Sequence, residues 1–282
     1  MSEARERVPA ERLAMLDEAL HRAGSVLVAF SGGCDSAFLL AAAVRALGVE
    51  HVAAATAVSS SLPGTELDQA REFAATLGVR HLTPATDEMS RPGYRANDTE
   101  RCFHCKAELL DVLKPLAAAL GLAHVATGTN ADDAVDPFRP GIRAAAERGA
   151  ITPLRYAGLT KAEIRLTSRS WSLPTWDKPA AACLSSRVAY GLSITPLRLA
   201  RVERAERALR QRLTGAGLAV RNLRVRDLGE VARVEIDAAL VPALLARPHL
   251  IDEVQGFSRV EVDPIGFRSG SMNELVASPS DG

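Results

Sequence analysis

A short apolar run that leads through a glycine-rich turn into a helix constrains this chain more than any other feature. Residues Ser25–Phe30 (SVLVAF) form a continuous apolar run, which is typical of a strand buried in a parallel sheet. The Ala/Leu-rich stretch Ser36–Leu47 follows and ends at Gly48, as a helix does. The sequence therefore predicts a strand, a tight turn and a helix in direct succession.

The same alternation continues through the first half of the chain. Further strands are predicted at His51–Val58, Val79–Pro84 and Ala123–Thr127, and further helices at Pro63–Leu77 and Cys102–Leu120, the latter with a kink or break at Pro115. Thr160 and Glu163 have the spacing of a capping box, which predicts a helix that runs to about Trp171. Strands that alternate with helices predict an α/β fold with a doubly wound, mainly parallel sheet.

The pattern changes after a loop that contains two prolines, residues 173–187. An Arg-rich helix is predicted at Pro196–Leu213, a strand pair at Leu223–Arg226 and Val231–Ile236, then a short helix and a last strand at Arg259–Val262. These elements predict a smaller C-terminal α+β domain. We place the boundary near Arg187, which gives domains 1–187 and 188–282, and we expect the tail 277–282 to be disordered.

Composition and charge exclude several classes of protein. Lys and Arg number 34 and so do Asp and Glu, and only 4% of the 282 residues are aromatic. Both values argue against a protein that binds nucleic acid through a basic surface with stacking aromatic side chains. The charged N-terminus lacks the apolar segment of a signal peptide, no apolar run is long enough for a membrane helix, and four cysteines are too few for a disulfide framework. We therefore expect a cytoplasmic protein without a membrane segment.

The turn Ser31–Ser36 (SGGCDS) has the chemistry of an anion site. It opens a predicted helix, where backbone N–H groups and the positive end of the helix dipole point at one place. Gly32 and Gly33 allow a phosphate to approach the backbone, Ser31 and Ser36 offer hydroxyl groups, and Asp35 is suited to hold Mg²⁺. The spacing is that of neither a Walker A loop nor a dinucleotide fingerprint. A capped turn without a ligand is the alternative.

A second polar turn, Gly128–Asp133 (GTNADD), follows the strand predicted at Ala123–Thr127. Ligands bind at the carboxyl ends of strands in open α/β sheets, so Gly128, Asn130 and Asp132 are candidates for nucleotide contacts. An Asx-turn that merely caps a helix is an equally good interpretation from these residues alone.

Two cationic or metal-binding patterns remain. Cys102 and Cys105 form a C-x₂-C pair, which can chelate a metal or cluster, form a redox disulfide or have no role.

Arg224 and Arg226 lie two residues apart on a predicted strand, so their side chains point to one face of the sheet. This spacing suits two charge-assisted contacts to a phosphate. Two arginines that simply face solvent are the alternative. Glu235 is expected near the same place.

These motifs carry a family resemblance. The SGGCDS turn resembles the SGGxDS loop of the PP-loop ATP pyrophosphatases, in which Asp35 matches the family aspartate and Cys34 fills the variable position. Three further stretches resemble the LarE family of ATP-dependent sulfur transferases, and the resemblance spans roughly residues 9–275. They are Arg101–Lys106 (RCFHCK), Ala182–Arg187 (ACLSSR) and Gly266–Glu274 (GFRSGSMNE).

The resemblance implies a reaction and a set of site residues. Transfer of AMP from ATP activates a carboxylate of a pyridinium dicarboxylate mononucleotide, and a sulfur nucleophile then displaces AMP to leave a thiocarboxylate. ATP would be held by Ser31, Gly32, Gly33, Asp35, Ser36, Gly128, Asn130 and Asp132. Cys183 and Asp35 would be catalytic, and the substrate phosphate would meet Arg224, Arg226 and Arg187. The second domain would bind substrate and support a homo-oligomer.

The source of the sulfur stays open between two routes. Cys183 matches a family cysteine that in one branch gives up its own sulfur and becomes dehydroalanine. Since Cys102 and Cys105 are also present, we favour a [4Fe–4S] cluster on these three cysteines as the means of delivery. A tRNA thiolase of the PP-loop superfamily is the main rival, and the balanced charge argues against it. An amide-forming PP-loop enzyme and a nucleotide-sensing module are weaker rivals.

Overall fold

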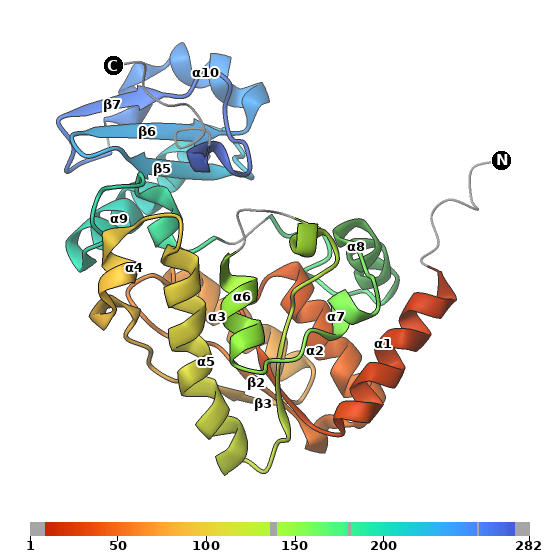
Figure 1. Ribbon diagram of the computed structural model, residues 1–282. Helices are drawn as coiled ribbons and strands as arrows, with labels where there is room; N and C mark the ends of the chain where they lie inside the picture. The colour runs from red at the N-terminus through yellow and green to blue at the C-terminus, as the bar shows by residue number, and fades with distance from the viewer. Residues whose placement is uncertain (1–8, 136–139, 180–181, 253, 274–282) are drawn as a thin grey trace. The chain divides into compact units, whose positions relative to one another are not determined.

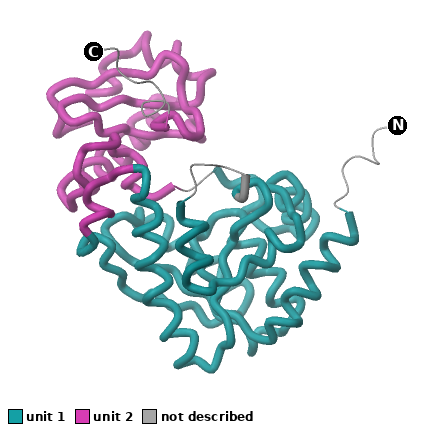
Figure 2. The backbone as a smooth tube through the Cα atoms, viewed as in Figure 1, with its two compact units in different colours: residues 1–91, 99–181 teal, residues 92–98, 182–282 magenta. Residues whose placement is uncertain are grey.

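The computed structural model describes residues 9–135, 140–179, 182–252 and 254–273. The expected disordered tail and Glu274 of the Gly266–Glu274 motif lie outside these ranges. Two compact units make up the chain, and Figure 2 distinguishes them. The first unit consists of residues 1–91 and 99–181, and the second of residues 92–98 and 182–282. Over the described ranges, no helix combines the length and the apolar character that crossing a membrane requires.

A four-stranded parallel sheet forms the centre of the first unit (Figure 1). Its strands are β1 (Val26–Ala29), β2 (Val52–Ala55), β3 (Arg80–Leu82) and β4 (His124–Thr127), in the order β3-β2-β1-β4. Its helices are α1 (Ala10–Ala23), α2 (Cys34–Leu47), α3 (Gly64–Thr76), α5 (Arg101–Ala119), α6 (Pro140–Glu147), α7 (Pro153–Tyr156) and α8 (Lys161–Ser170). The predicted α/β class with a parallel sheet is confirmed.

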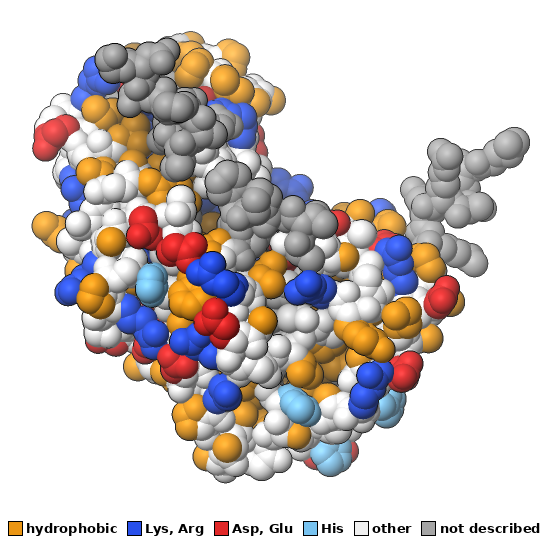
Figure 3. All heavy atoms as spheres, viewed as in Figure 1, with side chains coloured by type: hydrophobic (Ala, Val, Ile, Leu, Met, Phe, Trp, Pro, Cys, Tyr) orange, Lys and Arg blue, Asp and Glu red, His pale blue; other side chains and the backbone are white. Residues whose placement is uncertain are grey.

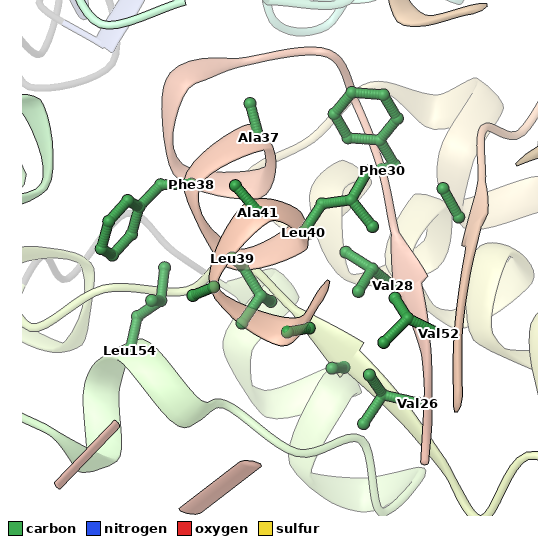
Figure 4. Packing of buried hydrophobic residues seen from close by; sticks show 14 of the residues in the cluster. Val26, Val28, Phe30, Ala37, Phe38, Leu39, Leu40, Ala41, Val52 and Leu154 are labelled. Carbon is green, nitrogen blue, oxygen red and sulfur yellow. The ribbon is translucent and has the colours of Figure 1, made fainter. Parts of the chain in front are cut away.

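Helices cover both faces of this sheet because successive strand residues point to opposite sides. Val26 and Val28 of β1 pack with the apolar side chains of α2 in one buried cluster, as Figure 4 shows. Leu27, between them, packs with Leu110 and Leu113 of α5 in another. Full burial of each such side chain contributes roughly 1.5–3 kcal/mol. The continuous apolar run in the sequence thus reflects a strand with no solvent-facing side.

The helix α5 continues through Pro115, so the break expected there is wrong. A proline inside a helix removes one backbone hydrogen bond and costs about 3 kcal/mol. Leu110, Leu113 and Ala117 on either side of it are buried in the core, and this packing offsets the cost. The capping box at Thr160 and Glu163 is confirmed at the start of α8.

The second unit has a three-stranded mixed sheet with its own apolar core. β5 (Leu223–Asp227) pairs antiparallel with β6 (Val231–Ile236), and β6 pairs parallel with β7 (Arg259–Val262). The helices α9 (Pro196–Gly215) and α10 (Val241–Leu245) supply Leu209, Leu213 and Leu244 to the core beneath it. The predicted smaller α+β unit is therefore present.

One short segment from the first half of the chain belongs to this second unit. The helix α4 (Pro92–Ala96) carries Tyr94, whose hydroxyl lies 2.5 Å from Ser185 Oγ. Asn97 adopts a left-handed conformation with φ of 55° and donates to the carbonyl oxygens of Ala189 and Leu192. The second unit is thus assembled from two separate segments of the chain, which a single domain boundary in the sequence does not describe.

Charges of both signs alternate on the surface of the first unit. On the face drawn in Figure 3, Lys and Arg side chains lie among Asp and Glu side chains rather than in one continuous basic area. Ion pairs in the first unit include Arg91 with Glu108 and Arg148 with Asp111.

Candidate active site

The turn between β1 and α2 has the form of an anion-binding loop. Gly32 has φ of +70°, a conformation that favours glycine, and Gly33 is the residue before the first turn of α2. The hydroxyl groups of Ser31 and Ser36 lie 3.1 Å apart, and Ser36 also donates to the carbonyl oxygen of Gly33. These bonds fix a loop whose backbone N–H groups lie at the positive end of a 14-residue helix.

Asp35, in the first turn of α2, is paired with a residue that the sequence analysis did not identify. Its Oδ2 lies 2.5 Å from Nζ of Lys161, the first residue of α8. Its Oδ1 is buried, and no donor among the described residues reaches it. A carboxylate oxygen that is buried and unpaired is suited to a cation, and this matches the role predicted for Asp35. The capping box before Lys161 is the one sequence signal that fixes the position of this lysine.

The second polar turn lies directly against the phosphate loop. A Cβ on Gly128 would come within 2.9 Å of Ser36 N and 3.1 Å of the Asp35 carbonyl carbon, so only glycine fits there. Asn130 is buried and exchanges two hydrogen bonds with Asp133, while Asp132 Oδ2 accepts from the backbone N–H of Lys161. The structure therefore brings the two predicted nucleotide motifs together.

A third segment reaches the same loop from residues 173–179. Lys178 Nζ donates to the carbonyl oxygen of Gly32 at 3.1 Å and to Glu66 Oε2 at 2.7 Å. Cys34 is buried nearby, with its thiol directed at the carbonyl oxygen of Trp176. Burial raises the pKa of the Cys34 thiol, which keeps it protonated at neutral pH. The cysteine at the variable position of the loop is thus a packed, protonated side chain.

Cys102 and Cys105 occupy the first turns of α5, in the first unit. Cys102 is exposed and Cys105 is half-buried. Burial lowers the pKa of the neighbouring Lys106, while the sulfur atoms of Cys105 and Cys102 and the carboxylate of Asp133 act to raise it. Within the described ranges, no three His, Cys, Asp or Glu side chains form a group that would hold a metal ion.

Cys183 belongs to the second unit, unlike the cysteine pair. It is half-buried and directly precedes the 3₁₀ turn Leu184–Arg187. Its carbonyl oxygen accepts hydrogen bonds from the backbone N–H and the hydroxyl of Ser186 and from Nη1 of Arg187. The backbone at the predicted sulfur-bearing residue is therefore held by three donors.

The three predicted phosphate-binding arginines are all buried in the second unit, so the alternative of solvent-facing side chains is wrong. Arg226 pairs with Glu235 Oε2 at 2.7 Å and also contacts Ser271, which in turn donates to Glu235 Oε1. Arg187 pairs with Glu206. Burial and then the charge of Arg187 lower the pKa of Arg224 to about 10, so Arg224 remains charged at neutral pH.

Among the described residues, Arg187 and Arg226 have carboxylate partners, while Arg224 donates to the carbonyl oxygen of Leu223 and lies over the Phe267 ring. Sequence reasoning placed Glu235 here but missed Glu206 and Ser271. Glu206 lies in the Arg-rich helix α9, where acidic residues between arginines indicate surface pairs. Ser271 falls within the Gly266–Glu274 motif, which the sequence analysis marked without assigning a function to its members.

Comparison with known proteins identifies relatives over almost the whole chain. The chain is 33% identical over 270 residues to the pyridinium-3,5-bisthiocarboxylic acid mononucleotide synthase of Lactiplantibacillus plantarum, and the match covers 95% of each protein. It is 42% identical over 255 residues to an uncharacterized protein of Synechocystis, covering 89% of this chain and 92% of that protein. An uncharacterized protein of Methanocaldococcus jannaschii is 27% identical over 175 residues, 61% of this chain and 66% of its own length. No protein-family model matches the chain.

Proposed function

Because the chain belongs to the LarE family of sulfur transferases, we propose that it converts the carboxylates of a pyridinium dicarboxylate mononucleotide into thiocarboxylates at the expense of ATP. The observation that carries this proposal is the contact of Gly128 with the first turn of α2, which joins two nucleotide motifs around Asp35. Near full-length similarity to a synthase of a bisthiocarboxylic acid mononucleotide gives the substrate class.

The first step is adenylation of the substrate. A carboxylate oxygen attacks the α-phosphorus of ATP, the bond to the β-phosphate oxygen breaks, and pyrophosphate leaves with the electron pair. The backbone N–H groups at the start of α2 and the hydroxyl groups of Ser31 and Ser36 receive the pyrophosphate. Gly128, Asn130 and Asp132 complete the nucleotide site. The product is an acyl-adenylate, in which AMP is a good leaving group.

Mg²⁺ fits the chemistry of Asp35, whose buried Oδ1 has no donor among the described residues. When bound there, Mg²⁺ would neutralise the phosphate oxygens of ATP. The ammonium group of Lys161 is paired with the other carboxylate oxygen of Asp35 and supplies a fixed positive charge beside the same phosphates. The ammonium group thereby orients Asp35 and lowers the repulsion between the carboxylate and the nucleotide.

The second step uses Cys183. In the sacrificial route, the Cys183 sulfur attacks the acyl carbon, the bond between that carbon and the AMP oxygen breaks, and AMP leaves with the electron pair. Loss of the Cα proton and cleavage of the Cβ–Sγ bond of Cys183 then leave thiocarboxylate and dehydroalanine. In the cluster route, Cys183 would be a cluster ligand, and a sulfide would attack the same carbon and displace AMP in the same way. Four residues of chain separate Cys183 from Lys178, whose ammonium group donates to the carbonyl oxygen of Gly32, so the chain holds the Cα atoms of these two residues within about 18 Å of each other.

The origin of the transferred sulfur depends on the other two thiols. Cys102, Cys105 and Cys183 would supply three of the four ligands of a [4Fe–4S] cluster, and the open position would provide a replaceable sulfide when the cluster is bound. We favour this route over the sacrifice of the Cys183 sulfur, because the cysteine pair on α5 has no role in the sacrificial route. Both routes need reduced thiols, which fits a cytoplasmic location, and we propose a homo-oligomer as the working assembly.

Arg224 receives the substrate phosphate, and Arg226 lies beside it with all three guanidinium nitrogens engaged by Glu235, Ser186 and Ser271, so it contacts the phosphate only by exchanging one of these partners. Arg224 is buried among like charges, so a phosphate there forms a charge-assisted contact and relieves their repulsion. Both arginines lie on β5, in the same unit as Cys183. We propose that the second unit holds the substrate and the nucleophile, while the first unit holds ATP.

Anaerobic reconstitution with iron and sulfide, followed by turnover with the pyridinium dicarboxylate mononucleotide and ATP, tests the proposal. We expect pyrophosphate, AMP and thiocarboxylate in equal amounts, and absorbance near 400 nm before turnover. Pyrophosphate release that does not depend on the mononucleotide would contradict the proposed substrate. Dehydroalanine at position 183 after turnover, without absorbance near 400 nm, would replace cluster delivery by the sacrificial route.

A further inference from the structure

Arg187 makes five hydrogen bonds around the Cys183 turn, through all three nitrogens of its guanidinium group. Its side chain is 4% exposed. Nε and Nη2 bind the two carboxylate oxygens of Glu206 at 2.9 and 3.2 Å. Nη1 donates to the carbonyl oxygens of Ala182 and Cys183 and to Ser186 Oγ. All three nitrogens of the guanidinium group are therefore engaged within the second unit.

These partners differ from those of a phosphate ligand. A phosphate at Arg187 would have to displace a two-point carboxylate or the carbonyl oxygens on either side of the Cys183 side chain. Because the Arg187 side chain is itself buried, each of these hydrogen bonds that is broken without replacement costs about 1–3 kcal/mol. The charge of Arg187 still acts on Arg224, whose pKa it lowers, but its hydrogen bonds are directed at the Cys183 backbone.

Glu206 extends the same network to the strand that carries the phosphate arginines. Its Oε1 accepts both Arg187 Nε and the backbone N–H of Val225, which lies between Arg224 and Arg226 on β5. Arg226 Nη1 in turn donates to the carbonyl oxygen of Ser186. The Cys183 turn is thus linked to β5 twice, once through Glu206 and once through Arg226.

From these contacts we propose that Arg187 and Glu206 are positioning residues, which hold the Cys183 turn at a fixed distance from the phosphate-binding strand β5. This inference rests on the proposed function and deepens it. Both ends of this link lie in the second unit. The distance between the bound substrate phosphate and the Cys183 sulfur is therefore fixed independently of ATP binding. The pair then acts on the sulfur step, where Cys183 Sγ bonds to the acyl carbon and AMP departs, and leaves adenylation unaffected.

The test separates the two steps in a single turnover without added sulfide. Protein, ATP and the pyridinium dicarboxylate mononucleotide are mixed, pyrophosphate is measured, and the thioester adduct on Cys183 is measured by intact mass. The variants are Arg187→Met and the milder Glu206→Gln, which retains an acceptor for the Val225 N–H. Arg207→Met is the matched control, since Arg207 is an exposed residue one position along the same helix.

For Arg187→Met we expect pyrophosphate release with a substrate KM within about threefold of the parent protein, and at least tenfold less Cys183 adduct per pyrophosphate, since small misplacements of a nucleophile are costly. Glu206→Gln should shift the same ratio in the same direction, and it carries the test if Arg187→Met does not fold. The control should shift neither quantity.

Two outcomes would overturn the inference. A tenfold rise in substrate KM for pyrophosphate release, with the adduct ratio unchanged, would make Arg187 a phosphate ligand. An adduct ratio equal to that of the parent protein in both variants would remove any positioning role. Cys183→Ala distinguishes these from failure of the proposed function: if that variant still forms thiocarboxylate in the reconstituted assay, the sulfur step itself has been misassigned.

Discussion

The two units build their sites from different materials. In the first unit, the phosphate loop depends on backbone geometry: Gly32 has a positive φ, and Gly128 leaves room for the first turn of α2. In the second unit, the site consists of charged side chains that form ion pairs: Arg187 with Glu206 and Arg226 with Glu235. A backbone site is damaged by any added atom, whereas a charged site is damaged when its balance of charge changes.

This difference predicts the size and the kind of effect that substitutions have. At Gly128, a single methyl group would lie within 3.1 Å of backbone atoms of α2, so we expect it to impair nucleotide binding. In the charged cluster, a side chain can be replaced by one of similar size with little loss of structure, while its ligand is lost. The predictions below test this contrast, from the largest expected effect to the smallest.

Gly128→Ala should be the most damaging single change. The added Cβ would lie 2.9 Å from Ser36 N and 3.0 Å from Ser36 Cα, so the two nucleotide turns must separate. A shift of about 1 Å in a reacting group costs about 100-fold in rate, and we expect at least that loss in pyrophosphate release. A steady-state pyrophosphate assay measures it.

Gly215→Ala is the control for this change, because a Cβ at Gly215 meets no atom within 4 Å. It should release pyrophosphate at the parent rate. Near-normal activity of Gly128→Ala would mean that the two turns need not touch, and the contrast between backbone and side-chain sites would lose its main support.

The sequence predicts the backbone site much better than the side-chain site, and the reason is physical. Ser31–Ser36 and Gly128–Asp133 are contiguous motifs, and parallel strands place their carboxyl ends at one edge. The carboxylate and hydroxyl partners of Arg187 and Arg226 come from α9, β6 and the Gly266–Glu274 motif. Nothing in one sequence says which of the many Glu and Ser residues will meet a given arginine.

Arg224→Met should weaken substrate binding without destabilising the protein. Burial and the charge of Arg187 lower the pKa of Arg224, which means that the charged form is disfavoured in the free protein. An apolar side chain of similar length removes that penalty but also loses the hydrogen bond to the Leu223 carbonyl oxygen and the contact with the Phe267 ring, so we expect a Tm within a few degrees of the parent. The substrate KM for pyrophosphate release should rise about tenfold to 100-fold, as expected for one charge-assisted contact, with the KM for ATP unchanged.

Thermal unfolding with and without the pyridinium dicarboxylate mononucleotide checks both halves of this prediction. The parent protein should gain stability from the ligand, and Arg224→Met should not. A variant that melts well below the parent would show that Arg224 serves the fold, and the distinction between the two units would then be weaker.

Thr160→Ala should lower both the stability of the protein and the rate of pyrophosphate release by a moderate amount. The Thr160 side chain accepts from the Glu163 N–H, and Glu163 bonds back to the Thr160 N–H, so the substitution loses a capping box worth about 1 kcal/mol. Since Lys161 begins the same helix and pairs with Asp35, pyrophosphate release should fall by a few fold. Thr160→Ser keeps the cap and should restore both stability and rate; failure of this rescue would separate the cap from Asp35.

Cys34→Ala should have the smallest effect of the four, although Cys34 lies within the phosphate loop motif. Its thiol is buried, and burial raises its pKa above the usual value, so the uncharged form prevails at neutral pH and its reactivity is low. Its replacement removes one buried sulfur and should cost about 1 kcal/mol of stability, with pyrophosphate release within about twofold of the parent. Iodoacetamide should label Cys183 and Cys102 in the folded protein well before Cys34, as peptide mass analysis would show. Rapid labelling of Cys34, or loss of activity in Cys34→Ala, would place a reactive side chain in a loop that we describe as a backbone site.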